Sequence, residues 1–177
     1  MDMAPPDLPD TLPDIELKCP SDFDEHALVP PNATDDCDKS VVVEREVQGF
    51  DKCKADFDVV WTAIDDCSKT DSVSQKVRFT GTTLPTIACP ANATFTNGGD
   101  TFTHAVSYGD CYTAADISIE YDATCYGNDG EGCTVKAVPK AAGLTISGAP
   151  AGSRVDWTAR LNYGCGVIAA TCSAHAA

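Results

Sequence analysis

Two short stretches decide the fold class of this sequence of 177 residues: FDVVWTA at 57–63 and VDWTARL at 155–161. In both, apolar side chains alternate with mostly polar ones around a central tryptophan. Successive side chains of a β-strand point to opposite faces of the sheet, so a period of two predicts half-buried strands. We therefore expect two strands that each bury one tryptophan in a core.

Similar alternation recurs along the chain. No stretch shows the spacing of three to four residues, preceded by a cap, that is typical of a helix. The pattern predicts an all-β fold of antiparallel strands with little helix. The further alternating segments are 41–47, 73–79, 102–108 and 117–123.

An internal repeat divides the chain. LPDI at 12–15, before Cys19-Pro20, matches LPTI at 84–87, before Cys89-Pro90, and the motif Trp-Thr-Ala occurs once after each. Self-similarity of this kind indicates tandem modules. We expect an acidic, proline-rich extended segment at 1–14, a first module at 15–83 and a second module at 84–177 with an inserted, Cys-bounded hairpin around 112–150.

The first fourteen residues contain four prolines and four aspartates. This composition favours extended backbone and builds no core of its own. Two roles remain open for residues 1–14. The segment is either a tail or linker, or a strand that docks on the sheet edge of a neighbouring copy, with 14–18 as the pairing stretch.

Charge and hydropathy exclude several classes of partner. Twelve Lys and Arg against 27 Asp and Glu give a net charge of −15, so neither nucleic acid nor an anionic membrane is expected as partner. No apolar run approaches the roughly 18 residues of a membrane span. The ten cysteines indicate disulfides and an oxidising, extracellular or cell-surface location, from which we expect that a signal peptide has been removed.

Disulfides are the simplest interpretation of the cysteines, because their spacings do not match a zinc site. An even number permits five bonds, although sequence alone leaves the connectivity open. Equivalent positions in the two modules should be bonded equivalently, which favours Cys37 with Cys67 and Cys111 with Cys165.

Four segments carry a family resemblance: PNATDDCD at 31–38, VWTAIDDCSK at 60–69, SQKV at 74–77 and LPTIACPANAT at 84–94. They are similar to the tandem hyalin-repeat-like (HYR-like), immunoglobulin-like modules of large extracellular proteins. The sequence departs from that pattern at Asp36, where the family has Asn, and at Ser68-Lys69, where it has Gly-Asn. The resemblance implies two tandem immunoglobulin-like β-sandwiches, stapled by disulfides, that serve as spacer, adhesion or assembly units and not as an enzyme.

The resemblance also implies a bond between Cys89 and Cys172, because the first cysteine of such a module lies near one in its last strand. Cys125 with Cys133 would then staple the inserted hairpin, and Cys19 is left to Cys53.

Binding candidates are acidic turns and glycosylation sequons. Calcium takes six to eight oxygen ligands from short turns, and the carboxylates that a bond between Cys37 and Cys67 would bring together are Asp35, Asp36, Asp38, Asp65 and Asp66. No cofactor is required, and calcium is the one candidate metal. Asn32-Ala33-Thr34 and Asn92-Ala93-Thr94 are N-glycosylation acceptor sequences.

No catalytic constellation is expected. His26, His104 and His175 have no nucleophile or acidic partner at a known spacing, and His104 alternates with apolar residues as a core histidine does. The two tryptophans are core residues or, alternatively, sugar-stacking platforms. The leading hypothesis is a subunit or spacer of a surface filament or matrix that contacts its own copies or other extracellular proteins. A glycan- or calcium-dependent adhesin is the alternative.

Overall fold

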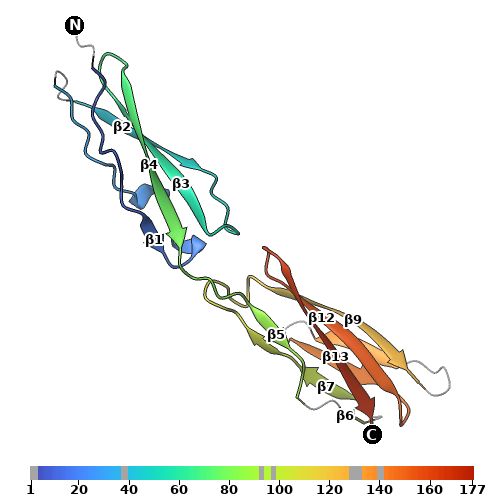
Figure 1. Cartoon of the computed structure of the whole chain (residues 1–177). Helices are drawn as coiled ribbons and strands as arrows, with labels where there is room; N and C mark the ends of the chain where they lie inside the picture. The colour runs from blue at the N-terminus through green and yellow to red at the C-terminus, as the bar shows by residue number, and fades with distance from the viewer. Residues whose placement is uncertain (1–3, 37–39, 92–93, 97–98, 128–132, 139–141) are drawn as a thin grey trace. The chain divides into compact units, whose positions relative to one another are not determined.

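The computed structural model describes residues 4–36, 40–91, 94–96, 99–127, 133–138 and 142–177, and its regular secondary structure is almost entirely strand (Figure 1). It forms two compact units, Met1–Thr82 and Thr83–Ala177. The helices of the described residues are two short 3-10 turns, η1 (Pro20–Asp22) and η2 (Glu25–Ala27). The predicted fold class, all-β with disulfides and little helix, is confirmed.

The first unit contains one sheet of four strands. Their order is β1 (Ile15–Leu17), β4 (Thr70–Phe79), β3 (Asp56–Ile64) and β2 (Val42–Gln48). β1 runs parallel to β4, whereas β3 is antiparallel to both of its neighbours. The alternating apolar residues at 57–63 of β3 face the core, as their period predicted: Phe57, Val59, Trp61 and Ala63 are at most 3% exposed.

The described part of the expected extended segment, residues 4–14, belongs to this compact unit. Leu8 is 5% exposed and packs in the core. Asp7 and Thr34 exchange backbone hydrogen bonds of 2.7 and 3.1 Å, and the Leu8 amide donates to Asp71 Oδ2. The prolines do prevent a strand ladder, yet the leucines supply apolar area that covers the open face of the sheet.

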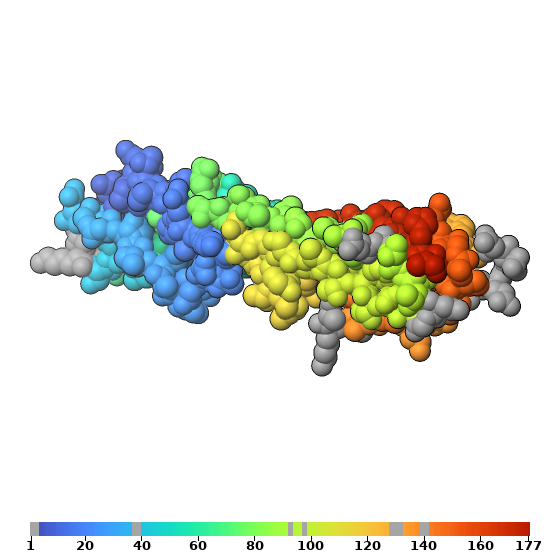
Figure 2. All heavy atoms as spheres, turned by 90° about the horizontal axis from the view of Figure 1, so that it is seen from below, coloured from blue at the N-terminus to red at the C-terminus, as the bar shows by residue number. Residues whose placement is uncertain are grey.

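The second layer of the first unit is therefore irregular backbone. Residues 20–34 pack Phe23, Leu28 and Ala33 against the core of the unit, and no strand of that layer pairs with another in the described residues. Residues 8–14 run beside β4 in the register that β1 continues, with Leu8 bonded to Asp71 and Pro13 to Gln75. In the space-filling view these segments, coloured blue, form most of the visible face of the unit (Figure 2).

The second unit is a sandwich of two sheets around one core. One sheet has the order β6 (Thr94–Phe95), β13 (Val167–Ala176), β12 (Arg154–Asn162) and β9 (Ser118–Tyr126). The facing sheet has the order β10 (Thr134–Val138), β11 (Gly143–Ser147) and β7 (Asp100–Thr103). A further pair joins β5 (Thr86–Ala88) to β8 (Ala105–Ser107).

The inserted segment of the second unit differs from the expected hairpin around 112–150. Its first strand, β9, pairs with β12 in one sheet, while β10 pairs with β11 in the other. The insertion therefore supplies β10 and β11, two strands that the first unit lacks. Leu144 and Ile146 of β11 are fully buried, which explains why these residues form a second sheet.

Candidate functional site

Trp61 lies at the centre of the first unit. It is 1% exposed, and its Nε1–H donates to Gln75 Oε1 on β4 at 3.0 Å. Gln75 Nε2 in turn donates to the carbonyl oxygen of Pro13 at 2.9 Å. The amide of one side chain thus satisfies the buried indole N–H and ties the N-terminal segment to the sheet.

Trp157 is the equivalent residue of the second unit, on β12 and 2% exposed. Its Nε1–H donates to His104 Nε2 at 2.9 Å, while His104 Nδ1 lies 3.0 Å from the Ala142 carbonyl oxygen. An indole N–H only donates, so Nε2 must accept and the proton of neutral His104 sits on Nδ1, which donates to Ala142. Burial lowers the pKa of His104, although the Ala142 carbonyl opposes this shift.

Both tryptophans and His104 are thus core residues, as predicted. The alternative of sugar-stacking platforms is wrong, because neither indole face is accessible. The expected strand through residues 102–108 is interrupted: β7 ends at Thr103 and β8 begins at Ala105. His104 lies between the two strands, where its backbone amide donates to the Ala142 carbonyl oxygen at 3.0 Å and its ring reaches Trp157.

The cysteines are mostly oxidised. The structure joins Cys89 to Cys172 and Cys125 to Cys133, two of the pairs expected above. Cys19, Cys53, Cys111 and Cys165 are disulfide-bonded as well.

Cys67 differs, because it is an exposed free cysteine. Its expected partner, Cys37, lies outside the described residues. Cys67 lies in the turn after β3. Its amide donates to Asp65 Oδ1 at 2.8 Å, and the backbone amide of Lys69 donates to the same oxygen at 2.7 Å.

The acidic residues proposed for calcium do not assemble in the described part of the chain. Asp65 is buried, Asp35 half-buried, and Asp36 and Asp66 exposed, while Asp38 lies outside the described residues. No group of three or more His, Cys, Asp or Glu among the described residues is placed to hold a metal ion. Asp65 instead fixes the turn between β3 and β4, and its Oδ2 is buried without a hydrogen-bond partner.

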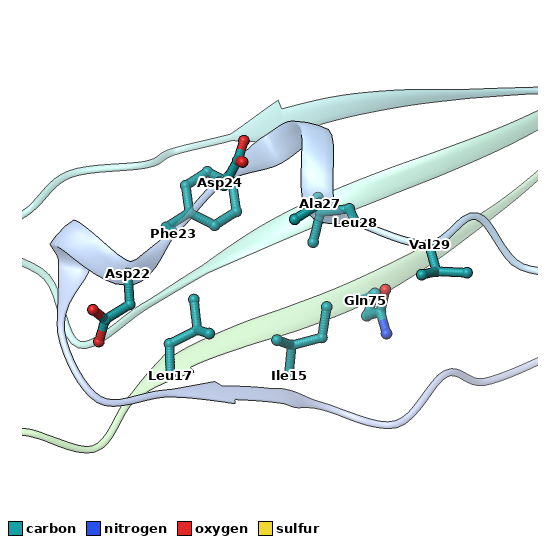
Figure 3. Close-up of a pocket in the computed structure, with 9 residues that line it drawn as sticks. All are labelled: Ile15, Leu17, Asp22, Phe23, Asp24, Ala27, Leu28, Val29 and Gln75. Carbon is teal, nitrogen blue, oxygen red and sulfur yellow. The ribbon is translucent and has the colours of Figure 1, made fainter.

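An open groove of about 350 Å³ lies in the first unit between β1 and residues 22–29 (Figure 3). Its apolar walls are Ile15 and Leu17 on one side and Leu28 and Val29 on the other. Val29 is 81% exposed. The sequence analysis did not identify this groove, because residues 22–29 follow no periodic pattern and their only signal is a group of apolar residues in an acidic stretch.

The remaining predicted positions are scattered. Asn32 is exposed, and Asn92 lies outside the described residues. His26 is exposed beside Glu25 and Arg45, and His175 lies on an exposed position of β13. In the part of the chain that the structure describes, no helix is long and apolar enough to cross a membrane.

Comparisons with known proteins give a fold-level likeness only. No protein-family model and no curated protein matches the sequence. Similar solved structures include Drosophila N-cadherin EC1-4, with 12% identity, a TM-score of 0.41 and coverage of 98% of this chain and 50% of that one. Human protocadherin-24 EC1-2 has 9% identity, a TM-score of 0.38 and coverage of 97% and 98%. Drosophila OTK extracellular domains 3–5 have 10% identity, a TM-score of 0.42 and coverage of 97% of this chain and 62% of that one. At these TM-scores we base no functional statement on the likeness.

Proposed function

We propose that this chain is an extracellular structural or adhesive protein, a subunit or spacer of a surface filament or matrix. The observation that carries the proposal is the disulfide-bonded cysteines in each of the two tandem β units. Disulfides persist in oxidising, extracellular compartments, where small domains with modest cores depend on them. The sequence resemblance to HYR-like modules supports the same role.

The decisive measurement is the state of association under native, non-reducing conditions. Light scattering coupled to size exclusion, with electron microscopy of the same fractions, is expected to show polymers or a stable complex with another extracellular protein. A chain that stays monomeric at every concentration and captures no extracellular partner contradicts the proposal.

We further propose that the chain carries an N-linked glycan at Asn32, which its exposure supports. Enzymatic removal of N-glycans from protein purified from its native source should lower the mass, and Asn32→Gln should abolish part or all of that change.

A calcium-dependent contact is the second candidate function. It is favoured by Asp65, a 94% buried carboxylate with one unpartnered oxygen. If Asp65 contributes to a calcium site, millimolar calcium should raise the unfolding temperature of the first unit relative to magnesium. Asp65→Asn, which keeps an acceptor for the two turn amides, should remove that shift.

A further inference from the structure

The groove of the first unit lies in the layer where the second unit has a second sheet. In the second unit, Leu144 and Ile146 of β11 close the core completely, at 0% exposure. In the first unit, the corresponding layer is irregular backbone, and the space between β1 and residues 22–29 stays open (Figure 3). An added segment there would cover apolar side chains that the unit leaves partly exposed.

The edge of the sheet beside this groove is also open. β1 pairs with β4 on one side only and is the outermost strand of its sheet. The Leu17 carbonyl oxygen accepts from the Thr80 amide, so the Leu17 peptide groups face β4. Because peptide groups alternate in direction along a strand, those of Glu16 face away from β4, where an extended segment can pair with them.

The negative charge at the groove favours a positively charged segment as its occupant. Asp22 and Asp24 line the groove, and neither forms an ion pair with any described residue. Asp22 accepts from the Cys19 amide through one oxygen, and Asp24 accepts from the His26 amide through one oxygen. Residues 1–83 contain 8 basic and 19 acidic residues, a net charge of −11. This field attracts cationic segments and repels a second copy of the chain.

We propose that the groove binds an extended segment of a different protein, in which β-branched or leucine side chains alternate with polar ones and a lysine or arginine meets Asp22 and Asp24. The apolar side chains would fill the space between Leu17 and Leu28, and the backbone would add to the β1 edge. This inference rests on the proposed adhesive function and specifies the chemistry of its partner.

The test uses the full, oxidised chain and three labelled peptides of eight residues. The first peptide alternates valine and threonine and has a lysine at each end. The second has the same valine–threonine centre with a glutamate at each end. The third has a lysine at each end and a centre of glycine and serine. Fluorescence anisotropy is expected to show the lysine–valine peptide binding at least about tenfold more tightly than either control.

Two variants locate the binding. Ala27→Trp should fill the groove, since Ala27 is exposed and lines it. It is expected to weaken the binding of the lysine–valine peptide by about tenfold. Ser74→Trp is the matched control, because Ser74 is exposed on the opposite face of the same sheet, and it should leave the affinity unchanged. The double variant Asp22→Asn, Asp24→Asn keeps both local acceptors and should reduce the preference for lysine over glutamate ends by about threefold to tenfold.

Equal binding of all three peptides, or equal affinity in the Ala27→Trp and Ser74→Trp variants, overturns the proposal. Self-association that Ala27→Trp abolishes would assign the groove to a second copy and also overturn it. The association assay of the wild-type chain separates this result from the proposed function. Polymers without peptide binding refute only the groove, whereas peptide binding without any larger assembly refutes only the filament or matrix role.

Discussion

The two units bury the same residue in two different ways. Trp61 donates to Gln75, which reaches a proline carbonyl of the N-terminal segment, and Trp157 donates to His104, which reaches the Ala142 carbonyl. In both units one polar side chain satisfies the indole N–H and also bonds to a backbone carbonyl of another segment. The first unit uses an amide that does not titrate, and the second uses an imidazole that does.

The layers also differ. The first unit covers its sheet with irregular backbone and leaves a groove, while the second closes its core with β10, β11 and β7. A central strand that buries a tryptophan, β3 in the first unit and β12 in the second, is therefore compatible with either kind of facing layer. The length of chain available to build the facing layer decides between a closed sandwich and an open one.

The largest expected effect concerns the disulfides of the second unit. Cys89 and Cys172 are separated by 83 residues, and Cys125 and Cys133 by 8. Replacing the first pair by alanine should lower the unfolding free energy by about 4–5 kcal/mol and replacing the second by about 2–3 kcal/mol, because a longer closed loop restricts the unfolded chain more. Denaturant unfolding measures both, and equal losses would contradict the loop argument.

The tryptophans test whether the units are energetically independent. Trp157→Ala should destabilise the second unit by about 3–5 kcal/mol and leave the first unit intact, and Trp61→Ala should do the reverse. Since each unit contains one tryptophan, the fluorescence of the remaining one reports the unmutated unit. Hydrogen exchange of peptides from the mutated unit reports the loss. A shift of both units in either variant would show coupled unfolding.

The N-terminal segment distinguishes the two second layers. Leu8→Ala should cost the first unit about 2–4 kcal/mol, because Leu8 is 5% exposed in its core. Leu84→Ala is the matched control, since Leu84 also precedes a proline but is 50% exposed, and it should cost less than about 0.5 kcal/mol. Chemical denaturation followed by Trp61 fluorescence measures the first variant. No loss of stability would mean that residues 4–14 are only loosely attached.

The smallest expected effect is acid sensitivity of the second unit alone. Protonation of His104 would place a hydrogen on Nε2, facing the Trp157 N–H, with Tyr121 and the Cys172 sulfur as the other near neighbours. The folded pKa lies below the ordinary 6.5, so the stabilisation is complete above about pH 6.5 and is lost as the pH falls below it. The unfolding free energy of the second unit is expected to fall by at most about 1.4 kcal/mol per pH unit through this group.

The control for this prediction replaces His104 by glutamine, the residue type that accepts from the tryptophan of the first unit. His104→Gln should keep an acceptor for Trp157 and remove that part of the acid sensitivity, which hydrogen exchange of the second unit between pH 5 and 7.5 would measure. An identical pH dependence in the variant would show that other groups cause it.

Strand positions with strict alternation were predictable from the sequence. The burial of Trp61 and Trp157 follows from their period of two and needs no tertiary information. β13 was not recognised from its pattern, because alanines occupy both faces of Val167–Ala176 and the hydrophobic contrast disappears. Its place between β12 and β6 depends on long-range pairing, which no local signal encodes.

The candidate groove and the cysteine partners show the same division. Composition alone pointed to disulfides, but only the structure shows Cys67 exposed and free, in a turn whose amides bind Asp65. Acidic residues could be counted in the sequence, although only the structure places Asp22 and Asp24 beside Leu28 and Val29. Proximity in space is not a property of residues 22–29 by themselves.

By itself, then, the sequence determined the all-β class, the two modules, the oxidised cysteines and the tryptophan cores, since each depends on local periodicity, repetition or composition. Only the tertiary structure decided that residues 4–14 are part of the first core, that β9 and β10 belong to different sheets, and that His104 supports Trp157. These features depend on which apolar surfaces remain uncovered after the central strands have paired, and that balance is set by the whole chain.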